Sequence, residues 1–268
     1  MGRFWSILFL LVPVLGVGVF ACAMMTDTWP LYDYWLPVDV SSDGAVIDSL
    51  FNFILVLTGV IFVLTSLALF WFLWKYDATK NPDPVKFTHG SHSLEIVWSI
   101  LPAVTLLFIA IYQMNAWANA KMDRPLEEDG VTPVPAMAEV TGRQFEWRIR
   151  YPGDDGELYT PDDLFDVNEL HVPMDEPVVL RIQSEDVLHS FFLPNMRIKQ
   201  DLVPGMTQHV WFKAIKDGEY DIVCAELCGW GHYKMKGRIH VEERGEFEAY
   251  LKKLSKDQNL AEYQPEEE

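Results

Sequence analysis

Three long stretches without a charged residue constrain this chain more than any other feature of its sequence. They span residues 4–25, 49–74 and 96–120. A helix needs about 20 apolar residues to cross the roughly 30 Å of hydrocarbon in a bilayer, so each stretch is long enough. No further stretch of this kind follows. The sequence therefore predicts a protein anchored in a lipid bilayer by a transmembrane helical hairpin over 49–120, with helices at about 49–74 and 95–119.

The few basic residues of this region predict its orientation. Before Lys121 the chain has only Arg3, Lys75, Lys80 and Lys86. The segment 26–48 has none, although it carries five aspartates. Because Lys and Arg favour the cytoplasmic side, we expect the loop between the hairpin helices to be cytoplasmic and 26–48 to be an outer-side segment. The second hairpin helix then delivers the rest of the chain to the outer side.

The first charge-free stretch, within residues 1–25, is open to two interpretations. Arg3, an apolar run and small residues before Cys22 resemble a signal peptide. A retained N-terminal membrane helix fits the charge pattern equally well. The letters VFAC also match a lipoprotein cleavage site loosely, although Phe20 departs from it. Cys22 is therefore either a lipidated residue or a buried thiol.

The sequence after the hairpin predicts a linker followed by a β domain. Residues 121–138 include the polar, proline-bearing stretch RPLEEDGVTPVPAM. Over 139–245, short runs alternate apolar with polar residues and are separated by Gly, Pro or Asp, which is typical of an all-β sandwich or barrel. Residues 246–268 are expected to complete a short helix, begun at about 245 and ending near 254, and to continue as an acidic tail.

Two of the three cysteines lie in one segment, CAELCGWGHYKM, at residues 224–235. The two thiols could form a disulfide, because this domain faces an oxidising compartment. Their neighbours favour a metal instead, since Cys228, His232 and Met235 offer the thiolate, imidazole and thioether of a copper electron-transfer site. A single-copper site leaves Cys224 without a role. Two facing thiolates could instead bridge two copper ions.

A site with two copper ions needs a second imidazole. His189, in SEDVLHSFFLPN, is the best candidate, because a strand that ends there can abut the cysteine segment. The other histidines of the outer domain are His171, His209 and His240. Each lies in an alternating strand, where a packed or surface role is the better interpretation.

Together these residues resemble subunit II of a bacterial haem-copper cytochrome c oxidase. The resemblance covers about residues 48–241 and rests on SEDVLHSFFLPN, KQDLVPGM, CAELCGWGHYKM and LEIVWSILPA. It implies a membrane-anchored all-β fold, in which a transmembrane helical hairpin carries a cupredoxin-like β-barrel or sandwich. It also implies an electron-transfer subunit of an aerobic respiratory terminal oxidase. Such a subunit accepts electrons from a c-type cytochrome and passes them to haem in subunit I, where oxygen reduction is coupled to proton translocation.

The resemblance further implies a ligand set for a dinuclear copper A centre. Cys224 and Cys228 would bridge the two ions, and His189 and His232 would each bind one. Met235 and the backbone carbonyl of Glu226 would be weak ligands. The Glu226 carboxylate would reach a Mg or Mn ion shared with subunit I. Glu95 would lie at the entrance of a proton-uptake path completed by subunit I, and no residue of this chain would be catalytic.

The same resemblance implies the surroundings of the protein. Its partners would be the haem-bearing subunit I, subunit III and a c-type cytochrome donor. It would be a multi-pass protein of the bacterial inner membrane, with the copper domain on the periplasmic side. No nucleic-acid partner is expected.

One segment departs from the family pattern. The family places Gln-Trp-aromatic-Trp where electrons enter, whereas this chain has RQFEWRI. Trp147 matches the second Trp, but Phe145 replaces the first, which is the usual residue of electron entrance, and Glu146 replaces the aromatic between them. The copper ligands are thus retained while the contact residue is not. A different c-type cytochrome, including one held in a larger complex, could be the donor.

Two other functions fit parts of the pattern. A quinol-oxidase subunit II of the same fold would have lost the copper ligands, and all of them are present. A membrane-anchored copper carrier or sensor would need an open site and no polar hairpin face. Gln113, Asn115 and Asn119 on the second hairpin helix indicate packing against other membrane helices, which favours the oxidase.

Overall fold

The structure is a computed structural model that describes residues 2–25, 35–77, 80, 87 and 89–262. The chain forms two compact units. Residues Met1–Pro37 and Asp48–Met114 make up a helical unit, and residues Val38–Ile47 and Asn115–Glu268 make up a β unit. The predicted acidic tail beyond 262, part of the outer-side segment and most of the loop between the hairpin helices lie outside the described residues.

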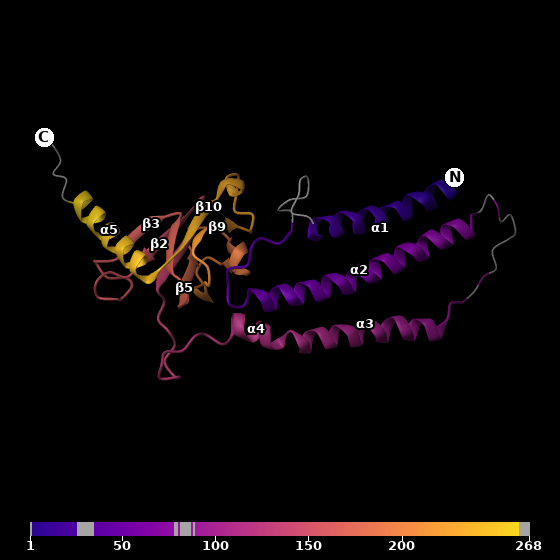
Figure 1. Ribbon diagram of the computed structural model, residues 1–268, viewed down its shortest axis with the longest axis horizontal. Coiled ribbons are helices and arrows are strands. Elements are labelled where there is room, and N and C mark those ends of the chain that lie inside the picture. The colour runs from indigo at the N-terminus through magenta and orange to yellow at the C-terminus, as the bar shows by residue number, and fades with distance from the viewer. Residues whose placement is uncertain (1, 26–34, 78–79, 81–86, 88, 263–268) are drawn as a thin grey trace. The chain divides into compact units, whose positions relative to one another are not determined.

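The charge-free stretches form three helices, α1 Gly2–Met25, α2 Gly44–Lys75 and α3 His92–Tyr112 (Figure 1). All three are long and apolar enough to cross a membrane, which confirms this part of the prediction. Aromatic rings join α2 to α3. The Phe53 ring centroid lies 6.2 Å from that of Phe108 and 5.9 Å from that of Tyr112.

The second arm of the hairpin is not the single helix expected over 95–119. Helix α3 ends at Tyr112, and a short helix, α4 Met114–Lys121, follows after Gln113. The Trp211 indole N–H donates to the Asn119 carbonyl at 2.8 Å. Asn119, one of the polar residues expected on the hairpin face, therefore contacts Trp211 instead. Most of α4 belongs to the β unit.

Ten strands in two five-stranded sheets form the body of the β unit (Figure 1). The strand orders are β3-β2-β1-β5-β8 and β4-β10-β9-β6-β7. Neighbours are antiparallel except for the parallel pairs β1–β5 and β4–β10. The strands are β1 Ala138–Arg143, β2 Glu146–Tyr151, β3 Leu164–Val167, β4 Glu169–Pro173, β5 Pro177–Ser184, β6 His189–Leu193, β7 Ile198–Leu202, β8 Gln208–Lys213, β9 Gly218–Cys224 and β10 Lys236–Glu242. The predicted all-β domain is confirmed.

The alternating pattern of the strands builds one core between the two sheets. In β2, Trp147, Ile149 and Tyr151 are fully buried, whereas the residues between them are partly exposed. Phe191 of β6 and Leu170 of β4 meet them from the other sheet. Burial of apolar surface stabilises by about 25 cal/mol per Å², so such large side chains hold the sheets firmly together. The core is the rigid frame that positions the loops at its edge.

The segment before α2 is part of the β unit. Val40 is fully buried, its N–H donates to the Asn195 carbonyl at 3.1 Å, and its carbonyl accepts the Ile215 N–H at 2.9 Å. The sequence predicted only that this region lies outside the membrane, because contacts with residues 155 and 175 positions later have no local signature.

The C-terminal helix α5 runs over Arg244–Glu262 and is longer than the short helix expected. Phe247 is buried, and the Tyr250 ring stacks on that of His171 with centroids 3.5 Å apart. His171 in turn stacks on His240 at 4.2 Å. Two of the strand histidines therefore pack in a stack of rings beneath α5.

Candidate metal centre

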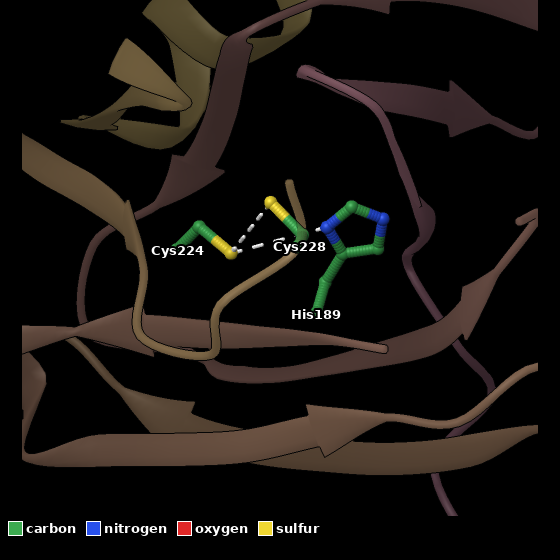
Figure 2. A group of neighbouring side chains, drawn as sticks. All are labelled: His189, Cys224 and Cys228. Atoms are coloured by element: carbon green, nitrogen blue, oxygen red, sulfur yellow. Dashed lines mark hydrogen bonds between the residues drawn. The ribbon is translucent and has the colours of Figure 1, made fainter. Parts of the chain in front are cut away.

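Two neighbouring strands bring the first two candidate ligands together. His189 begins β6 and Cys224 ends β9, and these strands pair with Phe191 opposite Cys224. The Ala225 N–H donates to the Ser190 carbonyl at 3.0 Å, which extends the pairing beyond the cysteine. His189 Nδ1 thereby lies 3.9 Å from Cys224 Sγ, and both side chains are buried (Figure 2).

The segment after Cys224 turns back into β10 and supplies the remaining candidates. The Cys224 N–H donates to the Met235 carbonyl at 3.2 Å, which closes the turn. Cys228 Sγ lies 3.9 Å from Cys224 Sγ, and the two sulfurs and His189 converge on one point (Figure 2). His232 Nδ1 and Met235 Sδ lie 3.6 and 3.8 Å from the Cys228 sulfur. The structure thus brings together every side-chain ligand predicted for copper.

The two thiols are buried and differ in acidity. Their sulfurs are 3.9 Å apart, whereas disulfide sulfurs are about 2.05 Å apart, so they are separate thiols. Burial opposes ionisation of Cys224, but hydrogen bonds, chiefly with His189, lower its pKa to about 6. Burial, together with the charge of Cys224, raises the pKa of Cys228 to about 12. Cys224 is therefore the thiol that ionises first.

Asp186 fixes the orientation of His189. One carboxylate oxygen lies 2.8 Å from His189 Nε2, and the other accepts the Gln144 N–H at 2.8 Å. Because Asp186 occupies Nε2, the nitrogen that faces Cys224 is Nδ1. Burial alone would lower the pKa of His189, but the thiol and the carboxylate raise it above its ordinary value. A carboxylate behind a ligating histidine fixes its tautomer and strengthens it as a ligand.

The donor set fits two soft metal ions. Thiolates, imidazoles and thioethers suit copper. Metal–thiolate bonds are about 2.3 Å long for zinc, so an ion between sulfurs 3.9 Å apart can reach both. One imidazole faces each sulfur, His189 at Cys224 and His232 at Cys228. Each of two ions could therefore share both thiolates and take one imidazole.

The backbone and side chain of Glu226 lie in different surroundings. The Glu226 carbonyl oxygen lies 3.2 Å from Cys224 Sγ and so belongs to the ligand cluster. The residue itself is exposed. This separation allows the carbonyl and the carboxylate to serve different ions.

The two residues expected where electrons enter differ in burial. Trp147 is fully buried, and its ring lies 6.2 Å from that of His189 and 5.4 Å from that of Phe191. A partner therefore cannot touch it. Phe145 is partly buried and lies against the cysteine segment, where any side chain at Gly231 would collide with its ring.

Glu95 belongs to the helical unit and not to the ligand cluster. It lies in the first turn of α3, which Ser91 caps by accepting the Leu94 N–H at 3.5 Å. The positive end of the helix dipole stabilises an acidic residue at this position. The Glu95 carboxylate is exposed and lies 3.7 Å from His92 Nδ1.

Three residues beside the cluster have no role in the sequence predictions. Asp186 lies three positions before His189 and contacts its Nε2 atom. Gln144 donates from its side-chain amide to the Cys228 carbonyl. Trp230 stands in the cysteine segment and contacts Phe145 edge to face. Only Trp230 had a signal in the sequence, namely a large aromatic residue between two glycines of a ligand loop.

Two family models match the chain. The model described as the cytochrome C oxidase subunit II periplasmic domain matches residues 139–242, and that of the transmembrane domain matches residues 28–116. Both halves of the expected architecture are therefore similar to one family, in the order expected.

Individual proteins are similar over most of the chain. The alternative cytochrome c oxidase subunit 2 of Bradyrhizobium diazoefficiens is 28% identical over 246 residues, which cover 82% of this chain and 84% of that protein. Cytochrome c oxidase subunit 2 of Alkalihalophilus pseudofirmus is 31% identical over 206 residues, covering 75% and 57%. Among solved structures, the periplasmic domain of cytochrome oxidase subunit II of Bradyrhizobium japonicum is 30% identical, with a TM-score of 0.42. The match covers 47% of this chain and 98% of the chain in that structure.

Proposed function

Since the chain belongs to the cytochrome c oxidase subunit II family and is an electron-transfer subunit of a terminal oxidase, we propose that the residues around Cys224 and Cys228 hold its dinuclear copper A centre. The ligands are His189, Cys224, Cys228, His232 and Met235, with the Glu226 carbonyl. The observation that carries the proposal is the pair of buried thiols, 3.9 Å apart, with one imidazole facing each sulfur. When bound, two copper ions supply a carrier of one electron.

The surrounding residues hold the ligands of this centre in fixed positions. His189 is held by Asp186, Cys228 by the Gln144 amide, and Cys224 by the backbone pairing of β9 with β6 and β10. The ligands are largely buried, so little water can reorganise when the charge of the site changes. Small rearrangement favours fast electron transfer and requires no open coordination position. The role of this chain is therefore to relay electrons, and the chemistry of oxygen belongs to another subunit.

The protein is a membrane protein with a periplasmic domain. We place it in the bacterial inner membrane, where its helices pack against the haem-bearing subunit I and subunit III. Electrons come from a c-type cytochrome on the periplasmic side. The strongly acidic outer domain supports a basic donor of this kind, because opposite charges speed association.

Two carboxylates extend this assignment. The exposed Glu226 side chain is proposed to bind a Mg or Mn ion at the junction with subunit I. Glu95 is proposed to stand at the entrance of the proton-uptake path, since it is an exposed acid in the first turn of a membrane-spanning helix.

Copper counting tests the proposed centre. The full chain, purified with its oxidase, is expected to hold two copper ions in this domain. Electron paramagnetic resonance is expected to show one unpaired electron shared by two copper nuclei. Cys224→Ser should abolish the shared signal, whereas Cys22→Ser should leave it unchanged. A spectrum of a single copper nucleus in the unsubstituted protein would overturn the assignment.

A further inference from the structure

The ligand-bearing turn presents three large side chains to solvent. Leu227, Trp230 and Tyr233 are 75%, 77% and 76% exposed, although their neighbours Cys228 and His232 belong to the ligand cluster. Exposed apolar groups of this size, gathered on one turn, mark a binding surface. Trp and Tyr are also the residues that most often dominate the energy of protein interfaces.

Trp230 is held in place by two contacts. Its ring meets that of Phe145 edge to face, with centroids 5.3 Å apart and planes at 69°. The Lys234 ammonium lies over the indole ring, 4.7 Å from its centroid. A side chain that is fixed before binding loses less conformational entropy in a complex than a mobile one. Trp230 is therefore a preorganised, exposed aromatic group.

We propose that Trp230 is the residue of this chain that receives the electron donor, in place of Phe145 and Trp147. This inference rests on the proposed copper A function. Trp147 is fully buried, and Phe145 is partly buried and contacts the more exposed Trp230 edge to face. Trp230 is two residues from both Cys228 and His232, so a donor in contact with its ring is close to the ligands.

The partner is a c-type cytochrome whose haem edge is exposed and rimmed by basic residues. Residues 121–268 carry 31 acidic and 17 basic residues, a net charge of −14, which complements such a rim. In the transfer, one electron leaves the ferrous haem, which becomes ferric, and one electron reduces the metal centre. Trp230 provides the contact and is neither oxidised nor reduced, and no proton moves.

Binding and electron transfer can be tested separately. Binding of ferric, basic cytochrome c to the oxidase by calorimetry needs no electron transfer. We expect Trp230→Ala to weaken this binding by about tenfold, as for an interface residue of dominant energy, and Trp230→Phe to weaken it less. Phe165→Ala, which removes a half-exposed aromatic ring from β3, is the matched control and is expected to change nothing.

Stopped-flow reduction of the centre by ferrous cytochrome c gives the second readout. Trp230→Ala should lower the second-order rate constant by at least about tenfold, in line with the weaker binding. The shared copper signal and reduction by dithionite should stay unchanged. Unaltered binding and rate in Trp230→Ala would overturn the inference, and so would slower transfer from the centre to haem, which would place Trp230 against subunit I. A missing copper signal in the unsubstituted oxidase would instead refute the copper assignment itself.

Discussion

Asp186 links the ligand cluster to the strand beside it. It accepts a hydrogen bond from the Gln144 backbone and lies within hydrogen-bond distance of His189 Nε2. The hydrogen bonds to the ionised carboxylate outweigh the effect of burial and lower the pKa of Asp186, so it is charged at neutral pH. A charged partner makes the imidazole a stronger ligand. The orientation of His189 therefore depends on a residue that need not touch metal.

We expect Asp186→Asn to lower copper affinity by roughly 10- to 100-fold, the usual cost of removing a partner of a ligating histidine. The amide keeps the size of the side chain but loses its charge. Competition with a copper chelator measures the affinity. Glu185→Gln, a change at the adjacent residue, which pairs with Arg148 at the surface, is the control. Equal affinities of the two variants would contradict the role given to Asp186.

The divided position of Glu226 leads to a second prediction. Glu226→Gln keeps the backbone carbonyl beside Cys224, so copper content and the shared copper signal should remain. Loss of the carboxylate charge should weaken Mn binding in the intact oxidase, which manganese resonance detects. Glu219→Gln, at an exposed acid of β9, is the control. Loss of copper with unchanged Mn binding would count against the assignment.

The stack of Tyr250, His171 and His240 attaches α5 to the sheet. Burial lowers the pKa of His171 below its ordinary value of 6.5, although Glu242, whose carboxylate lies 3.1 Å from Nδ1, opposes this. Asp166 also faces the stack, through a hydrogen bond from the Tyr250 hydroxyl at 2.5 Å. The folded protein therefore holds His171 neutral at a pH where the unfolded chain already takes up a proton.

The lowered pKa of His171 in the folded state determines how stability depends on pH. The contribution of His171 to stability should be constant above the ordinary histidine pKa and should fall as the pH drops below about 6.5, because the unfolded state binds the proton first. Thermal unfolding of the full chain between pH 5.5 and 8 measures the effect. His171→Gln should remove part of the slope. His92→Gln, at an exposed histidine of α3, should not. An identical slope in His171→Gln would exclude this role.

The strands and the ligand loop could be predicted because their signals are local. Alternation in segments such as β2 reports directly which side faces the core, and all but one of the copper side chains fall within twelve residues. The packing of Val40 on the β unit could not be predicted, because it depends on residues distant in sequence. Nor could the length of α5, whose last turns are polar and give no apolar period.

Trp230 and Asp186 illustrate why the site was only partly predictable. Aspartate is common in loops, and the roles of both residues arise from contacts with Phe145, Gln144 and His189 that only folding creates. The burial of Trp147 is different, because it follows the alternation of β2 and so has a local signal.

The negatively charged outer domain should attract a positively charged donor before the two proteins touch. Its net charge of −14 predicts that electron uptake from a basic cytochrome slows as ionic strength rises, because screening shortens to about 8 Å near 0.15 M salt. Stopped-flow reduction across a salt series measures this, and an uncharged small reductant serves as the control. A rate independent of salt would mean that the acidity serves solubility or that the donor is tethered.

The close approach of the Phe145 ring to Gly231 limits which residues can occupy these two positions. Because the ring fills the space that a side chain at 231 would need, positions 145 and 231 cannot vary independently. Phe145→Trp, which restores the residue expected from the family pattern, would push a larger ring against the same turn and displace Trp230. The family's tryptophan at position 145 would therefore be unfavourable unless the turn that contains Gly231 changed with it.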